Sequence, residues 1–196
     1  KNWGAEQFSS DIYGRNIWGC PTDSNGDFAW LQHMIKSMNP KTGRCAVVLP
    51  QGVLFRSGKE GEIRKHLVES DKLEAIITMA SGVSACILFL NNDKAPEHRG
   101  RICMIDGSGI YTPQRAQNIM TEEDIQTVFN YYTEYEDVIE KVKIVTIPEI
   151  REKDFSLAIN NYIEKKEQET VPPAEIRRQY FEAYKEMIAA EEKMRK

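Results

Sequence analysis

The side chains of this sequence that could take part in chemistry are few, and they form no recognised catalytic motif. Neither the Gly-x-Ser-x-Gly of serine hydrolases nor a glycine-rich phosphate loop is present. Gly107-Ser108-Gly109 follows a predicted strand and looks like half of a phosphate-binding loop, but a tight turn explains it fully. His33, His66 and His98 lie far apart in the chain, so we expect solvated or half-buried imidazoles rather than metal ligands. The residue types alone therefore indicate no reaction and predict no metal site.

Pro50-Gln51-Gly52 is the segment whose position is most informative. It directly follows the apolar run Cys45–Leu49, which is typical of a strand buried on both faces. Open α/β sheets bind their ligands at the carboxyl ends of strands, so Pro50, Gln51 and Gly52 are candidate binding residues. The alternative is that they simply terminate the strand. Four basic residues follow, which either contact phosphate or form a solvated helix face: Arg56, Lys59, Arg64 and Lys65.

The elements that must position these residues alternate between helices and buried strands. Apolar residues at helical spacing predict a helix from Asp27 to about Met38, capped by Asn25 or Asp27. The connection between the apolar runs Leu73–Met79 and Ser84–Leu90 is too short for a crossover helix, so these strands should pair antiparallel. The pattern is that of a three-layer α/β fold. The other expected elements before Pro148 are a loop over Lys1–Gly26, a helix after a Ser57-x-x-Glu60 capping box, a strand over Arg101–Asp106 and an edge strand over Lys143–Ile147. A further helix is expected over Thr121–Tyr132, capped by Thr121, with these residues inward: Ile125, Val128, Phe129 and Tyr132.

The last part of the chain has a different composition. Val171-Pro172-Pro173 predicts an extended linker, and the residues after it predict one long helix. An isolated amphipathic helix needs a partner for its apolar side, which is either the rest of its own chain or another chain. The apolar stripe of this helix consists of Ile176, Tyr180, Tyr184, Met187 and Ile188.

The overall composition limits the class of protein. The chain has 196 residues, of which 41% are hydrophobic, and its 26 basic and 30 acidic residues give a net charge of −4. This charge excludes a uniformly basic nucleic-acid binder and leaves room for a local basic face. The longest apolar run is far shorter than the roughly 20 residues of a membrane helix. Cys20, Cys45, Cys86 and Cys103 share no Cys-x-x-Cys spacing and are expected to be reduced residues of a cytoplasmic protein.

Short strings of the sequence carry more information than its composition. They occur in the order Trp3–Gln7, Gly26–His33, Gly43–Arg56, Glu62–Leu67, Leu73–Ile77, Val83–Leu90, Glu149-Ile150, Asp154–Leu157 and Asn161-Tyr162. This order and spacing closely resemble the modification (methyltransferase) subunit of type I restriction–modification systems, which are adenine-specific DNA methyltransferases.

The resemblance implies a Rossmann-like methyltransferase sheet that binds S-adenosylmethionine and methylates the exocyclic amino group of an adenine flipped out of double-stranded DNA. In this family an Asn-Pro-Pro-Phe motif binds that amino group, and the motif is expected upstream of Lys1, as is a glycine-rich cofactor loop. Neither is in this sequence, so no catalytic residue is assigned. The family also usually has several more residues, with an aromatic near the target base, between Gly82 and Ser84.

The resemblance adds residues and partners to these expectations. Trp3 is placed at the rim of the catalytic pocket, with loop packing as the alternative. Asp27 and Phe28 are placed beside the cofactor or target base, or else serve as helix cap and first core residue. Residues 1–110 would be the carboxyl-terminal half of the catalytic domain, 111–170 an α/β extension, and 171–196 a helix for subunit packing. The implied partners are DNA, a specificity subunit and, optionally, a restriction subunit, with no membrane.

Two other functions stay open at this point. The chain is alternatively a non-catalytic assembly module, whose sheet is a scaffold and whose terminal helix docks a DNA-specificity subunit. The third interpretation is an unrelated nucleotide-binding α/β enzyme, which would need a phosphate loop that the sequence lacks.

Overall fold

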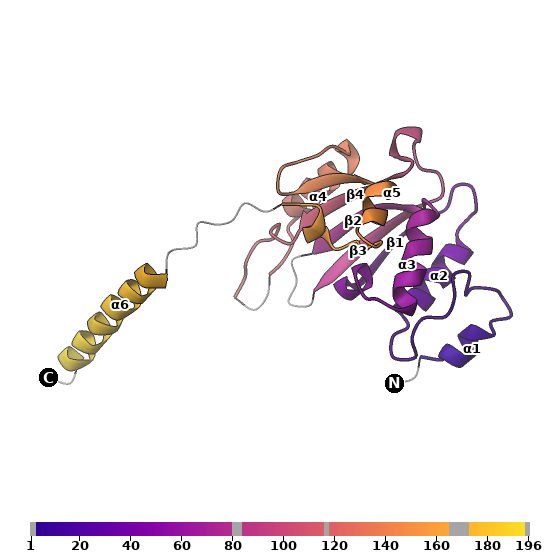
Figure 1. The fold of residues 1–196 in the computed structure, drawn as a ribbon. Coiled ribbons are helices and arrows are strands. Elements are labelled where there is room, and N and C mark those ends of the chain that lie inside the picture. The colour runs from indigo at the N-terminus through magenta and orange to yellow at the C-terminus, as the bar shows by residue number, and fades with distance from the viewer. Residues whose placement is uncertain (1–2, 80–83, 116–117, 165–172, 195–196) are drawn as a thin grey trace. The chain divides into compact units, whose positions relative to one another are not determined.

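The computed structural model describes residues 3–79, 84–115, 118–164 and 173–194 (Figure 1). The chain divides into two compact units, residues 1–164 and 165–196. The expected linker before Pro173 and the junction at Gly82 and Val83 lie outside the described residues. The elements are α1 (Ala5–Ser9), α2 (Asp27–Ser37), β1 (Arg44–Pro50), η1 (Gln51–Leu54), α3 (Lys59–Glu69), β2 (Leu73–Met79), β3 (Ala85–Asn91), η2 (Pro96–His98), β4 (Arg101–Gly107), α4 (Glu122–Glu134), β5 (Val142–Thr146), α5 (Ile147–Glu152), η3 (Ile159–Asn161) and α6 (Pro173–Met194).

A five-stranded sheet in the order β1-β3-β2-β4-β5 forms the centre of the first unit. The pairs β1–β3, β3–β2 and β4–β5 are antiparallel, and β2–β4 is parallel. The expected antiparallel pairing of the second and third strands is confirmed, with Ile77 opposite Ile87 and Leu73 opposite Leu90. The strand over 142–146 lies at the sheet edge, as predicted. The mixed α/β class expected from the sequence is therefore confirmed.

The side chains of β2, β3, β4 and β5 alternate between two separate hydrophobic cores, whereas β1 contributes to one of them alone. Ile76 and Leu88 belong to the larger core, under α2, α3 and α5, whereas Ile77 belongs to the smaller core, under α4. The larger core contains Leu31 of α2, Leu67 of α3 and Ile150 of α5. Because neighbouring residues of a strand point to opposite faces, these cores are the two faces of the sheet. We call the face under α2, α3 and α5 the first face and the face under α4 the second face.

Two helix starts differ from the sequence prediction. The segment expected to be a loop contains the single helical turn α1, which begins after Gly4 and buries Ala5 and Phe8. The Ser57-x-x-Glu60 capping box is wrong, because α3 begins one residue later, after Gly58, and its first turn has no side-chain cap. The carboxylate of Glu60 is instead taken up by an ion pair with Arg56, which removes it from the helix end.

The start of α4 agrees with the prediction, but its inward face is narrower than expected. The Thr121 hydroxyl accepts from the Asp124 amide, and the Asp124 carboxylate accepts from the Thr121 amide, which makes a complete capping box. Val128 is buried, whereas Ile125 and Phe129 are 49% and 54% exposed, so their predicted inward position is wrong. The reason is that α4 packs on β2 and β4 through one side only, with Phe129 and Ile125 at the rim of a groove.

The helix α6 is long and amphipathic, as predicted. Its apolar stripe is exposed over Ile176, Tyr180, Tyr184, Met187 and Ile188. In the described part of the chain, no helix combines the length and the apolar character that a membrane span requires.

Candidate functional site

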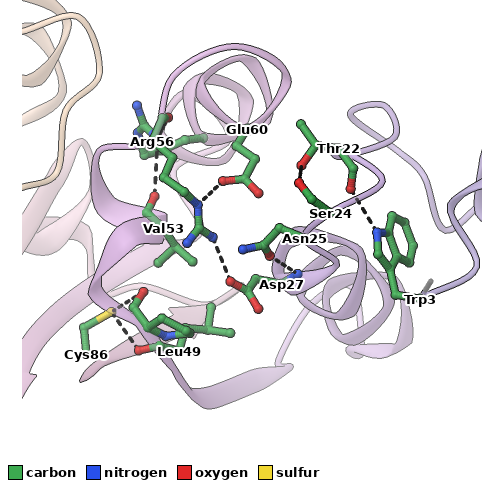
Figure 2. A network of polar contacts seen from close by, with 12 residues as sticks. Trp3, Thr22, Ser24, Asn25, Asp27, Leu49, Val53, Arg56, Glu60 and Cys86 are labelled. Carbon is green, nitrogen blue, oxygen red and sulfur yellow. Dashed lines mark hydrogen bonds and ion pairs between the residues drawn. The ribbon is translucent and has the colours of Figure 1, made fainter. Parts of the chain in front are cut away.

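The carboxyl end of β1 is held against the start of β3 by polar contacts. The Gln51 amide donates to the Ser84 carbonyl at 3.0 Å, and its side chain Nε2 donates to the Ala85 carbonyl at 3.3 Å. The Cys86 thiol donates to the Leu49 carbonyl at 3.5 Å, as Figure 2 shows. Pro50 is exposed at this corner and donates no amide hydrogen, so the strand ends there and η1 begins.

Arg56 joins the start of α2 to the first turn of α3. Its Nη2 atom lies 2.7 Å from Asp27 Oδ2, and its Nε atom is paired with Glu60 Oε2 (Figure 2). A Cβ at Gly52 would lie 2.5 Å from Arg56 Nη1, so a larger residue there would displace the guanidinium from this position. The sequence reasoning missed the pair of Arg56 and Glu60, although the spacing of four residues was a usable signal.

This network sets one guanidinium against two carboxylates. Burial lowers the pKa of Arg56, but its hydrogen bonds to Glu60 and Asp27 outweigh burial and hold that pKa above its ordinary value. Glu60 is 2% exposed, so its second carboxylate oxygen is shielded from water as well. Arg56 therefore acts as the charge partner of two carboxylates.

Arg64 extends the network under η1. This buried guanidinium donates to the Arg56 carbonyl at 2.6 Å and to the Phe155 carbonyl at 2.8 Å, and burial lowers its pKa. Arg56 and Arg64 are thus committed to internal partners, which argues against the phosphate contacts considered for them. Lys59 is exposed, and Lys65 lies over the Phe155 ring.

Trp3 lies next to the start of α2. Its indole Nε1 donates to the Thr22 carbonyl at 2.9 Å, and a Cβ at Gly26 would lie 2.9 Å from its ring (Figure 2). Asn25 Oδ1 accepts from the Asp27 amide at 2.9 Å, but the N-cap of α2 is Gly26 and no side chain caps the helix, so the predicted cap by Asn25 or Asp27 is wrong. The Asp27 carboxylate remains available to Arg56.

The structure brings most of the candidate residues to one corner of the fold. Asp27 and Gly52 meet at Arg56, Gln51 lies beside Gly52 in the chain, and Trp3 packs against the residue before Asp27. Phe28 is different, because it is 1% exposed and belongs to the core of the first face. Phe28 therefore anchors α2 and presents no surface to a ligand in this conformation.

The corner offers positioning rather than a nucleophile. The nearest thiol is Cys86, and burial raises its pKa to about 12, so it stays protonated at neutral pH. Among the described residues, no group of three or more His, Cys, Asp or Glu side chains is arranged to hold a metal ion. What the arrangement provides is a rigid, ion-paired edge at the end of a central strand.

Comparisons with known proteins place this fold in a family. Residues 1–171 match the N-6 DNA methylase family. The methylase subunit of the type I restriction enzyme HindI from Haemophilus influenzae is 33% identical over 96% of this chain and 45% of its own length. The MjaVIII methylase subunit from Methanocaldococcus jannaschii is 34% identical over 78% of this chain and 27% of its own length.

Solved structures agree with the sequence relatives. The type I restriction-modification methyltransferase subunit from Streptococcus thermophilus aligns with a TM-score of 0.76 and 29% identity, over 83% of this chain and 36% of that chain. The chain thus spans less than half the length of the relatives that it matches. The extent of these matches confirms the resemblance seen in the sequence, and the chain belongs to the N-6 DNA methylase family, among the methylase subunits of type I restriction enzymes.

Proposed function

We propose that the chain is part of a subunit that transfers a methyl group from S-adenosylmethionine to the exocyclic amino group of adenine in double-stranded DNA. The observation that carries this proposal is the match of residues 1–171 to the N-6 DNA methylase family. A base inside a duplex is not accessible to such chemistry, so the target adenine would be flipped out of the stack. Such an enzyme would act in the cytoplasm.

We further propose that residues 1–110 are the carboxyl-terminal half of the catalytic domain, and that 111–170 form an extension of it. Among the described residues β1 pairs with β3 alone, so its other edge offers unpaired backbone groups. Val48 of β1 is 67% exposed, unlike the apolar residues of β2. These features support further strands and covering helices at β1 in the longer relatives.

The residues of this chain do not by themselves fit a site for S-adenosylmethionine. The carboxylate at the corner, Asp27, is committed to Arg56, and the sequence has no glycine-rich cofactor loop. We therefore assign no catalytic step to this chain. The cofactor supplies an activated methyl group, and methyl transfer then depends on orientation and on exclusion of water.

The contribution of this chain would be to orient one wall of the site. Arg56 ties α2 to α3, and Gln51 ties the end of β1 to β3, so the corner cannot widen without breaking these contacts. A displacement of about 1 Å in such a wall is enough to reduce a rate strongly. Arg56 is thus a positioning residue in this proposal.

The test is a methyl-transfer assay with the full-length subunit, its specificity subunit, radiolabelled S-adenosylmethionine and duplex DNA. We expect label on the adenine amino group, and Arg56→Gln should lower the rate at least tenfold. Arg151→Gln is the matched control, because Arg151 is exposed and lies 3.9 Å from Glu69. Label on cytosine, or no transfer at all, contradicts the proposed reaction.

A calorimetric titration of the isolated chain with S-adenosylmethionine tests the proposed division of the catalytic domain. We expect weak binding or none, because most of the cofactor site would lie in the rest of the subunit. Tight binding would show that these residues hold a complete cofactor site.

The exposed stripe of α6 favours a second role, in assembly. Six large apolar side chains of this helix are exposed: Ile176, Tyr180, Phe181, Tyr184, Met187 and Ile188. We propose that α6 packs against another subunit of the complex, with the specificity subunit as the first candidate and a restriction subunit as the second. Ending the chain before Val171 should abolish binding of the partner and leave the circular dichroism of the first unit intact. Unchanged binding would contradict this role.

A further inference from the structure

A hollow of about 240 Å³ lies beside α2, outside the network around Arg56. Its walls come from the first helical turn, the loop after it and the middle of α2. Trp30 is 62% exposed at its mouth. The lining residues are Trp3, Gly4, Gln7, Phe8, Arg15, Ala29, Trp30 and His33.

The hollow faces away from the sheet. Ala29, Trp30 and His33 share one side of α2, since residues three and four apart are neighbours on a helix surface. Phe28 and Leu31 lie on the other side, in the core of the first face. A ligand in the hollow would therefore be separated from the sheet edge by the body of α2, which is about 10–12 Å across.

The walls are aromatic and are held in place by edge-to-face contacts. Trp30 and His33 meet at 88° with ring centroids 6.4 Å apart, and Trp3 meets Phe8 at 63° and 5.7 Å. An edge-to-face contact covers at most one face of each ring, so the largely exposed Trp30 keeps ring surface that can stack on a flat ligand. The volume is below the roughly 300–1,000 Å³ of pockets for drug-sized ligands, and it suits a single flat heterocycle.

Polar groups complement these rings. The His33 imidazole lines the hollow, and its buried Nδ1 atom has no hydrogen-bond partner among the described residues. Arg15 is fixed by Asp11, which accepts from Arg15 Nε at 2.9 Å and from the Arg15 amide at 2.8 Å. This pairing holds the pKa of Asp11 down at about 2. A guanidinium has five donors, so Arg15 still has some to offer to an anion.

We propose that this hollow binds one unstacked DNA nucleotide other than the acceptor adenine, with the base between Trp3 and Trp30 and its phosphate at Arg15. Aromatic stacking platforms with a nearby cation are how proteins hold unpaired bases. The inference rests on the proposed function, which makes DNA the substrate. The acceptor base belongs at the sheet edge, whereas this hollow faces outward.

The adenine group of S-adenosylmethionine has the same ring chemistry but lacks a phosphate. The position of Arg15 therefore favours a nucleotide over the cofactor. A binding experiment can therefore distinguish a DNA nucleotide from the adenine group of S-adenosylmethionine by the need for a phosphate.

The test measures binding of a short fluorescent oligodeoxyadenylate to the full 196-residue chain by anisotropy. Trp30→Ala should weaken binding at least tenfold, and Arg15→Gln should weaken it and reduce its salt dependence. Phe129→Ala is the matched control, because Phe129 is a comparably exposed aromatic residue on α4, and it should leave binding unchanged. Because Trp30 is mostly exposed, its substitution should leave the fold intact, which circular dichroism checks.

Competitors identify the source of the ligand. Deoxyadenosine monophosphate should displace the oligonucleotide, and S-adenosylhomocysteine should not. No binding by the unmodified chain, equal affinities of the Trp30→Ala and Phe129→Ala variants, or displacement by S-adenosylhomocysteine would each overturn the proposal. The assay measures binding alone, so its result is independent of whether the full-length subunit transfers methyl groups.

Discussion

The two faces of the sheet are covered to very different extents. On the first face α2, α3 and α5 contribute fully buried side chains such as Leu31, Leu67 and Ile150. On the second face α4 contributes one buried apolar side chain, Val128, and leaves an apolar groove of about 350 Å³ beside it. That groove is lined by Ile77, Met79, Ile87, Phe89, Met120, Ile125, Val128, Phe129 and Tyr132.

The chain therefore completes the hydrophobic core on the first face by itself and leaves the second face partly uncovered. The first face has a closed core, and the candidate corner at Arg56 is built from the helices on that side. The second face is open at β1, where Val48 is exposed. An apolar sheet surface of this kind is normally covered, which agrees with the proposal that the longer relatives continue the catalytic domain there.

Removing equal side-chain volumes from the two faces should give the largest difference in stability. Ile76 and Ile77 are consecutive residues of β2, both buried, and they point into the first and the second core. Ile76→Ala should lower the free energy of unfolding by about 2–5 kcal/mol, because its cavity lies in a closed core. Ile77→Ala should cost about 2 kcal/mol or less, since water and neighbouring side chains can enter its site from the groove.

Urea unfolding of the two variants measures this difference. A conservative pair, Ile76→Val and Ile77→Val, keeps the strand propensity and should give the same ranking with smaller losses, about 0.5–1.5 kcal/mol for Ile76→Val. Equal losses at the two positions would mean that the second face is as closed as the first.

The corner on the first face should be sensitive to the loss of one charge. Arg56→Met leaves the buried Glu60 carboxylate unpaired, and we expect a loss of about 2–3 kcal/mol, below that of a fully buried pair because Arg56 is partly exposed. The double variant Arg56→Met with Glu60→Met should recover part of this loss, since no buried charge remains. Additive losses in this double-mutant cycle would show that the two side chains do not interact.

The sequence predicted those parts of the fold that depend on local pattern. Continuous apolar runs located the strands, and the short connection after Leu73–Met79 predicted the antiparallel pairing with β3. The Thr121 cap was found because a capping box is a local feature. The inward position of Phe129 was wrong because helical periodicity shows which residues share a side, not how much of that side is covered.

The candidate site was harder to predict because its contacts join distant segments. Asp27 and Arg56 are 29 residues apart, and only the fold brings the start of α2 to the segment between η1 and α3. The position of Gln51 and Gly52 at a strand end was predictable from the rule for open sheets. Their use as supports for Arg56 and β3 was not predictable. A role at or near a ligand site stays a prediction for the whole set of candidates: Trp3, Asp27, Phe28, Pro50, Gln51 and Gly52.

Thiol labelling offers a smaller but direct comparison of the two faces. Cys86 lies in the first core and Cys103 in the second, and burial raises the pKa of each thiol to about 12. Both should therefore react only when the structure opens. In a background with Cys20→Ser and Cys45→Ser, we expect Cys103 to react about tenfold faster, which corresponds to about 1.4 kcal/mol less opening free energy. Equal rates would indicate that both faces open together in global unfolding.

The smallest expected effect concerns two tyrosines, one on each face. Burial and a 2.7 Å hydrogen bond to Glu74 raise the pKa of Tyr132, on the second face, to about 12. Burial raises the pKa of Tyr162, beside the first core, to about 12 as well. An unfolded tyrosine ionises near pH 10, so each side chain stabilises the fold fully below about pH 10 and loses that contribution as the pH rises to about 12.

Tyr132→Phe and Tyr162→Phe separate the two contributions. At pH 8 each should cost about 1 kcal/mol, the net value of one hydrogen bond, because Tyr132 loses Glu74 and Tyr162 loses the Ser156 carbonyl. Between pH 10 and 12 each variant should lose less stability than the unmodified chain, because one buried hydroxyl no longer ionises. Denaturant unfolding at pH 8 and between pH 10 and 12 measures the free energy of unfolding of each variant. If only Tyr162→Phe reduces the loss of stability between pH 10 and 12, then Tyr132 already ionises near pH 10 in the folded chain. Water in the groove of the second face would allow that ionisation.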